Sequence, residues 1–266
     1  RMHITQIFRG LDRTSYVHHL ATNISDSDPA YRAAPLHLHE VTSLPIVHRS
    51  PLSDLGNIWN VYSILSRRHF DIVHGHGAKG GLYARLLGRM TGAKVVYTPH
   101  GGHSHDQTTG LTKRVHITSE AILAKWTDAY VFESHYAQNQ FLKKIGLRDG
   151  TFWVNYNGIS TGRSTPDFST SRQNGEFVIG AFGRLEHAKG FDLLIKATKI
   201  LTEAGFSDVK CRIFGEGEYF DNLNLLITRL NLSEHVRLMG YSHQVSNDMT
   251  ACNIIVHPSR FDSMPY

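Results

Sequence analysis

The stretch Gly183-Arg184-Leu185-Glu186-His187-Ala188-Lys189-Gly190 lies between two segments of opposite character. Residues 177–182 before it are short, apolar and β-prone, which predicts a buried strand. Residues 191–201 after it repeat apolar side chains at helical spacing, which predicts an amphipathic helix. Arg184 and Lys189 are therefore expected in a strand-to-helix loop, near helix N–H groups that favour an anion. This loop is either a positively charged site of diphosphate size or a solvated turn with two surface charges.

The same alternation of apolar strands and amphipathic helices runs through the whole chain, which predicts an α/β fold with parallel sheets. The strands are expected at residues 3–8, 33–39, 44–48, 71–74, 94–98, 128–132, 152–156, 177–182, 209–214, 236–239 and 253–257. The helices are expected at residues 14–24, 54–68, 79–91, 112–126, 134–145, 191–204, 218–230 and 243–250. Expected helix N-caps are Asp54 and Ser134, and expected C-terminal stops are Gly92 and Gly146.

A polar interruption between residues 160 and 176 divides the chain. It predicts an N-terminal α/β domain over residues 1–160, a linker or hinge over 161–176, and a C-terminal α/β domain over 177–266. The last expected strand is followed by no helix before Tyr266. Since a parallel strand there needs a covering helix, we expect the second domain to be incomplete.

The composition is that of an ordinary globular protein, with 41% hydrophobic and 19% charged residues. No apolar run approaches the roughly 20 residues needed to cross a bilayer. Cys211 and Cys252 lie in apolar, strand-like surroundings, which favours reduced thiols and a cytoplasmic location. Residues 1–165 carry 18 Lys and Arg against 11 Asp and Glu, whereas residues 166–266 carry 10 against 12. The basic first half favours contact with an anionic membrane; nucleic acid is the weaker alternative, because no nucleic-acid motif is present.

A second candidate site is the segment Gly215-Glu216-Gly217, which also follows an expected strand and precedes an expected helix. Glycines in such a loop allow positive φ and close approach of the backbone to a ligand, although alone they indicate only a tight turn. The loop comes one strand–helix unit after the Arg184 loop. Both loops should therefore open at the same carboxyl edge of the sheet, where ligands of parallel sheets bind.

A third candidate site consists of histidines that end two strands of the first half, namely His74, His76, His100 and His103. Imidazoles at one sheet edge can bind a transition metal, hydrogen-bond a sugar hydroxyl or phosphate, or bond only to nearby backbone groups. No carboxylate or thiol joins them at a recognised metal-ligand spacing, so we expect no metal site. The first half thus supplies candidate cleft and acceptor residues.

Several segments together resemble the retaining, nucleotide-sugar-dependent glycosyltransferases of the "family four" group, which have the two-Rossmann GT-B architecture. The resemblance covers nearly the whole chain. It rests on Asp71-Ile72-Val73-His74-Gly75-His76, Tyr97-Thr98-Pro99-His100-Gly101, Val154-Asn155-Tyr156-Asn157-Gly158-Ile159, the run from Gly183 to Gly190, Gly215-Glu216-Gly217, and Pro258-Ser259-Arg260-Phe261-Asp262.

The resemblance implies roles for individual residues. Arg184 and Lys189 would bind the donor diphosphate, with Gly183, Gly215, Glu216 and Gly217 in the loops that enclose the nucleotide. His100 would lie at the reaction centre with Arg184 and Lys189 as catalytic residues. Asp262 falls where the family has the first glutamate of a pair. The aspartate side chain is one methylene shorter than that glutamate. Gly10 stands where the family commonly has a Gly-Gly doublet that contacts donor phosphates.

The resemblance further implies two parallel-sheet domains that face each other across a cleft, and sugar transfer from a nucleotide diphosphate sugar to a glycan or lipid-linked acceptor. Transfer would proceed with retention, without a metal or other cofactor, in polysaccharide or lipopolysaccharide synthesis. Two rival functions remain open at this point: a non-catalytic nucleotide-sugar-binding module and a GT-B nucleotide-sugar epimerase.

Overall fold

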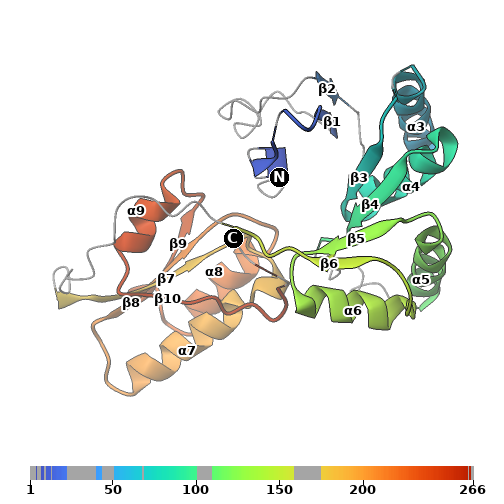
Figure 1. Ribbon diagram of the computed structural model, residues 1–266. Helices are drawn as coiled ribbons and strands as arrows, with labels where there is room; N and C mark the ends of the chain where they lie inside the picture. Colours follow the sequence, from blue (N-terminus) through green and yellow to red (C-terminus); the bar gives the residue numbers. More distant parts are fainter. Residues whose placement is uncertain are drawn as a thin grey trace. The chain divides into compact units, whose positions relative to one another are not determined.

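The computed structural model describes residues 14–22, 40–43, 51–67, 69–100, 110–158 and 175–262, together with residues 4, 7, 8, 10–12 and 264. Two compact units divide the chain (Figure 1). Unit 1 comprises residues 1–159 and 263–266, and unit 2 comprises residues 160–262.

Unit 1 contains a four-stranded parallel sheet in the order β3-β4-β5-β6. A separate parallel pair joins β1 to β2. The described strands are β1 (His19–Thr22), β2 (Glu40–Ser43), β3 (Ile72–His76), β4 (Lys94–Thr98), β5 (Ala129–Phe132) and β6 (Phe152–Val154). The described helices are α3 (Pro51–Leu65), α4 (Gly77–Thr91), α5 (Gly110–Ala124) and α6 (His135–Ile145).

Aromatic side chains form the core between this sheet and α6. Tyr97, Tyr130 and Phe132 are each at most 2% exposed, and Phe141 of α6 packs against all three rings. The core also contains a buried guanidinium. Arg85 of α4 lies 4.0 Å above the Tyr97 ring and makes a 2.9 Å ion pair with Glu120, which is buried too. Burial removes both charges from water, so the cation needs this carboxylate and ring as compensation.

Unit 2 contains a four-stranded parallel sheet in the order β10-β7-β8-β9. Its strands are β7 (Phe177–Phe182), β8 (Val209–Phe214), β9 (Val236–Gly240) and β10 (Ile254–Ile255). Its helical segments are the 3₁₀ turn η3 (His187–Lys189), α7 (Phe191–Glu203), α8 (Phe220–Arg229) and α9 (Val245–Thr250). Leu185, Ile195, Ile213 and Leu223 are fully buried in one core that joins the sheet to α7 and α8. Each unit is thus a Rossmann-like layer of parallel strands connected by helices.

Most expected elements are confirmed, several to the residue. The strands at 94–98, 177–182 and 209–214 have the expected bounds. Ser134 is the N-cap of α6, where its hydroxyl accepts from the Ala137 amide, and Gly92 and Gly146 end their helices in the left-handed conformation. Asp54 is wrong as an N-cap, because α3 begins at Pro51.

The expectations for the N-terminal segment are wrong where the structure describes it. Ile4, Ile7 and Phe8 are helical instead of extended, and the Leu11 amide donates to the Ile7 carbonyl at 3.0 Å. Their i, i+3, i+4 spacing suits a helix better than the alternation expected of a strand. The helix expected at 14–24 is replaced by β1, because the segment pairs with β2 about 20 residues later. Residues 33–39 and 44–48 and most of the expected linker lie outside the described residues.

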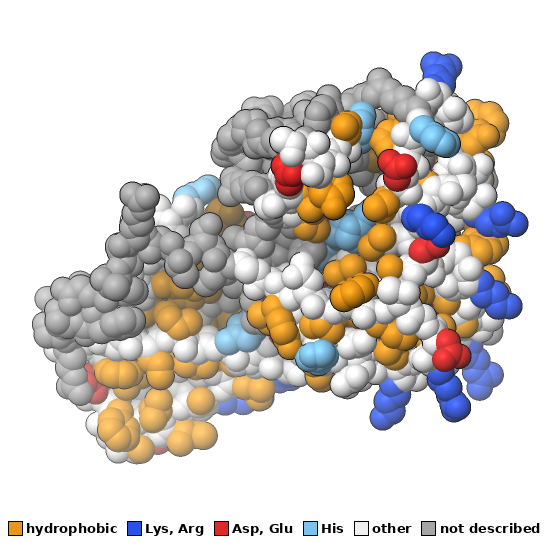
Figure 2. Space-filling view, viewed as in Figure 1, with side chains coloured by type: hydrophobic (Ala, Val, Ile, Leu, Met, Phe, Trp, Pro, Cys, Tyr) orange, Lys and Arg blue, Asp and Glu red, His pale blue; other side chains and the backbone are white. Residues whose placement is uncertain are grey.

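Among the described helices, none has the length and apolar content needed to cross a bilayer. Both cysteines are free thiols, and burial raises the pKa of Cys211 to about 12. In Figure 2, Lys and Arg side chains gather on the side of unit 1 where α5 and α6 lie in Figure 1.

The loops after β7 and β8 run side by side beyond the ends of their strands. The Gly183 amide donates to the Phe214 carbonyl at 3.0 Å, and the Leu185 amide donates to the Glu216 carbonyl at 2.9 Å. A Cβ at Gly215 would lie 1.9 Å from the Gly183 carbonyl oxygen, and Gly215 has a φ of +141°. Only glycine fits at this crossing of two backbones.

We therefore predict that Gly215→Ala lowers the free energy of unfolding of unit 2 by about 2 kcal/mol or more, since the methyl group forces the two loops apart. Urea unfolding followed by circular dichroism measures the loss. Gly205→Ala is the matched control, because Gly205 also has a positive φ, +94°, but open space around it. Equal losses for the two variants would show that the crossing is not a steric constraint.

Candidate functional site

The carboxyl edge of the unit 2 sheet gathers the loops that follow β7, β8 and β10. These strands are parallel, so the loops must leave at the same edge. The structure brings together the candidates Gly183, Arg184, Lys189, Gly215, Glu216, Gly217 and Asp262 in these three loops. The expectation that the first two loops share one edge is confirmed by their hydrogen bonds.

The first loop places Arg184 and Lys189 in different surroundings. The Arg184 side chain is 76% exposed, and its Nη1 lies 2.6 Å from Glu186 Oε1. Lys189 ends the turn η3 and is 20% exposed. Its Nζ donates to Asp262 Oδ2. Each cation therefore has a carboxylate partner, but only the pair of Lys189 is substantially shielded from water.

Asp262 joins the first loop from the far end of the chain. His257 Nε2 lies 3.0 Å from the Oδ2 atom that accepts from Lys189. Burial raises the pKa of the Asp262 carboxyl, but the hydrogen bond and charge of Lys189, together with His257, outweigh that effect and leave the pKa below its ordinary value. Asp262 is thus held ionised beside Lys189.

Two further residues belong to this edge, and the sequence did not single out their pairing. Arg260 donates from Nη1 and Nη2 to the two carboxylate oxygens of Asp192, at 2.6 and 2.7 Å. The hydrogen bond from Arg260 keeps the pKa of Asp192 below its ordinary value. Asp192 lies in the first turn of α7, where an acid is expected in any helix. No local signal points to a partner 68 residues away.

The glycine loop after β8 approaches the first loop along its whole length. A Cβ at Gly217 would lie 2.4 Å from the Leu185 carbonyl oxygen, and the same oxygen accepts from the Tyr219 amide at 2.9 Å. The Glu216 side chain is exposed. At Gly215 and Gly217 the loop therefore presents backbone without a side chain.

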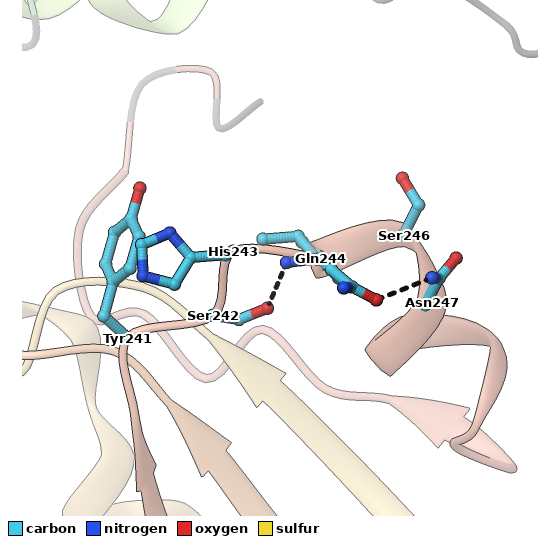
Figure 3. Close-up of a pocket in the computed structure, with 7 residues that line it drawn as sticks. Tyr241, Ser242, His243, Gln244, Ser246 and Asn247 are labelled. Atoms are coloured by element: carbon cyan, nitrogen blue, oxygen red, sulfur yellow. Dashed lines mark hydrogen bonds between the residues drawn. The ribbon is translucent and has the colours of Figure 1, made fainter. Parts of the chain in front are cut away.

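A shallow cavity of about 400 Å³ follows β9 (Figure 3). It is lined by residues 241–247. Tyr241 is 64% exposed, and its ring meets His243 edge to face with the centroids 4.9 Å apart. The Gly240 carbonyl accepts from the Gly215 amide at 2.7 Å, which connects this wall to the glycine loop. An exposed ring beside a polar hollow can stack on a flat ligand group.

In unit 1 the histidines gather at the carboxyl edge of the sheet, as expected. His76 Nδ1 lies 3.0 Å from His100 Nε2, with the two rings stacked. His74 Nε2 lies 2.8 Å from Thr98 Oγ1. His100 Nδ1 is also paired with the buried carboxylate of Glu133, directly after β5. Glu133 is a site residue that the sequence motifs do not predict, although an acidic residue directly after the strand next to β4 is a usable signal.

His103 lies outside the described residues. Gly10 is exposed within a helical segment, so the strand that was expected to precede it is absent there. In the described part of the chain, no group of three or more His, Cys, Asp or Glu side chains is arranged to hold a metal ion.

Comparison with known proteins assigns both units. Residues 1–163 match the family model described as Glycosyltransferase Family 4, and residues 163–266 match the one described as Glycosyl transferases group 1. The Escherichia coli protein named UDP-Gal:alpha-D-GlcNAc-diphosphoundecaprenol alpha-1,3-galactosyltransferase is 25% identical over 227 residues, which are 81% of this chain and 59% of that protein.

One further curated protein and one solved structure are similar to this chain, the structure in its fold. The Campylobacter jejuni protein named N-acetylgalactosamine-N,N'-diacetylbacillosaminyl-diphospho-undecaprenol 4-alpha-N-acetylgalactosaminyltransferase is 38% identical over 87 residues, 33% of this chain and 22% of that protein. The crystal structure of Anabaena HepE with UDP and glucose superimposes with a TM-score of 0.74 at 21% identity, over 97% of this chain and 70% of HepE.

The chain spans less than two thirds of the length of these two curated relatives. The Family 4 model nevertheless covers more than half of the chain, and the solved structure shares its fold throughout. The chain belongs to Glycosyltransferase Family 4 and has the two Rossmann-like units of the GT-B fold.

Proposed function

We propose that this protein transfers a hexose from a nucleotide diphosphate sugar to a glycan or lipid-linked acceptor. The observation that carries the proposal is that Arg184, Lys189 and Asp262 meet the glycine loop after β8 at one sheet edge. The HepE structures that share the fold contain UDP, UDP with glucose, or UDP-glucose. A nucleotide sugar is therefore the substrate class best matched to this edge.

The chemistry required of the site is stabilisation of a leaving diphosphate. As the bond to the anomeric carbon breaks, negative charge accumulates on that group, and Arg184 and Lys189 can neutralise it. Loss of one such donor typically costs on the order of 10²–10³ in rate. We propose retention of configuration, with the departing phosphate accepting the proton of the acceptor hydroxyl. His100, oriented by Glu133, is proposed to contact the sugar.

The acceptor side of the proposal rests on unit 1 and on the named relatives. The names of both curated relatives contain a diphospho-undecaprenol acceptor. We propose a lipid-linked glycan of this kind, in polysaccharide or lipopolysaccharide synthesis, with His74, His76 and His103 as acceptor or cleft residues. The cavity beside Tyr241 is proposed to receive the nucleobase, because it adjoins the glycine loop through Gly240.

A non-catalytic nucleotide-sugar-binding module and an epimerase are the rival functions. Both would use the same donor edge. Only a transferase releases free nucleoside diphosphate in proportion to an added acceptor, so an assay of that release with and without undecaprenyl diphosphate glycan separates the three.

We predict that the double variant Arg184→Ala/Lys189→Ala binds UDP at least about 100-fold more weakly, since hydrogen bonds to charged groups contribute roughly 1.5–3 kcal/mol each. Isothermal titration calorimetry on the full chain measures the affinity, and circular dichroism checks the fold. The matched control is Lys199→Ala/Arg237→Ala, which removes a lysine and an arginine elsewhere in unit 2. Undiminished UDP affinity in the first variant would refute the proposed donor site.

We also propose that the two cations replace a divalent metal, so that turnover needs no metal cofactor. The expected result is unchanged release of nucleoside diphosphate after treatment with EDTA. A loss of turnover that added Mg²⁺ or Mn²⁺ restores would contradict this proposal.

A peripheral position at the inner face of a membrane is proposed from the surface of α5 in unit 1. Val115 and Ile122 are 60% and 53% exposed and lie seven residues apart, on one face of the helix. Arg114 and Lys125 are exposed close to them in sequence. Apolar side chains flanked by cations suit a surface of anionic lipids.

We predict that Arg114→Glu/Lys125→Glu lowers binding to phosphatidylglycerol vesicles by roughly 30-fold, since each basic residue near the surface contributes about 1 kcal/mol. Co-sedimentation in low salt measures the binding. The control Arg229→Glu/Arg237→Glu makes the same charge change in unit 2. Vesicle binding that is insensitive to both salt and the α5 variant would argue against a charged membrane surface.

A further inference from the structure

The segment that follows β10 is fastened to the loop that carries Lys189. The Arg260 amide donates to the Ala188 carbonyl at 2.9 Å, and Arg260 Nη1 donates to the His187 carbonyl at 2.9 Å. The same guanidinium makes the two-bonded contact with Asp192. Arg260 therefore contacts the chain on both sides of Lys189.

The pair of Arg260 and Asp192 is well suited to hold a fixed geometry. A planar guanidinium that donates two parallel hydrogen bonds to one carboxylate is restrained in orientation as well as distance. The side chains are 23% and 11% exposed, so water competes little with the contact. Lys196 Nζ lies farther from Asp192, at 3.6 Å, and is mostly exposed. Arg260 is thus the principal partner of Asp192.

A close backbone approach reinforces this contact. A Cβ at Gly190 would lie 2.1 Å from the Pro258 carbonyl oxygen, and Gly190 is in the left-handed conformation with a φ of +68°. Residues 258–260 therefore pack directly against the residues on either side of Lys189. Two residues farther on, Asp262 reaches Lys189 itself.

We propose that Arg260 and Asp192 are positioning residues of the donor site, which together hold Lys189 and Asp262 in place for the diphosphate sugar. The pair does not contact the donor; it fastens the two loops that do. This inference rests on the proposed function, because it assumes that Lys189 binds the diphosphate. It adds a requirement to that function: full affinity for the diphosphate needs the ion pair of Arg260 with Asp192 at the start of α7.

Calorimetric titration of the full chain with UDP and with inorganic pyrophosphate tests the proposal. Asp192→Asn and Arg260→Gln should each weaken both ligands about tenfold. The double variant should bind no more than about twofold more weakly than the weaker single variant, because both changes break the same contact. Arg260→Lys should give an intermediate affinity, since lysine keeps the charge but not the paired hydrogen bonds.

The controls make matching charge changes at exposed positions elsewhere in unit 2. Glu203→Gln removes an exposed acid from α7, and Arg237→Gln removes an exposed arginine from β9; both should bind pyrophosphate as the unmodified chain does. All titrations are made well below each variant's melting temperature, so that lowered stability alone leaves the affinity of the folded protein unchanged.

Lowered melting temperatures with unaltered affinity for pyrophosphate would overturn the positioning role, since the pair would then be a structural brace only. The Arg184→Ala/Lys189→Ala variant separates this failure from that of the proposed function. If it loses affinity while the Arg260 variants keep theirs, the donor site stands and the positioning role is wrong. If all of these variants bind normally, the donor site itself is wrong.

Discussion

Parallel pairing of β7 with both β8 and β10 is the constraint on which the candidate site depends. Strands that run in the same direction must deliver the following loops to one edge, whatever the distance between them in sequence. Here that edge receives loops that begin near residues 183, 215 and 256. The two backbones that cross at Gly183 and Gly215 leave no room for a side chain, so the loops are fixed by contact rather than by strand pairing alone.

The charges at this edge are balanced before any ligand arrives. Arg184 forms an ion pair with Glu186, Lys189 with Asp262, and Arg260 with Asp192. Any anion that binds at this edge must therefore compete with carboxylates. Exposed ion pairs such as that of Arg184 contribute about 0–1 kcal/mol and separate easily. The pair of Lys189 is better shielded from water, so it is harder to separate.

The sequence predicted much of the fold because short apolar runs of β-prone residues mark buried parallel strands. The strands at 94–98 and 209–214 have the expected bounds for that reason. The prediction is wrong near the N-terminus, where a strand is expected but the spacing of Ile4, Ile7 and Phe8 fits a helix. The prediction is also wrong where pairing with a distant segment determines the secondary structure. An example is β1, which is extended because it pairs with β2.

For the site, local motifs identified the loops but not the contacts between them. Lys189 and Asp262 were each predicted, whereas their pairing across 73 residues was not. The contacts of Arg260 with Asp192 and of Glu133 with His100 were missed for the same reason: side chains that meet across loops leave no periodic signal in sequence. Parallel strand order brings such residues close together, but which side chains pair is seen only in the three-dimensional structure.

In the proposed function, Arg184 and Lys189 hold the diphosphate of an activated sugar. A crystal structure of the full chain with UDP is the direct test. We expect phosphate oxygens within hydrogen-bond distance of Lys189 Nζ and of the Arg184 guanidinium, with Lys189 no longer bonded to Asp262 alone. A complex in which UDP is bound while both ion pairs stay intact and the phosphates lie elsewhere would contradict it.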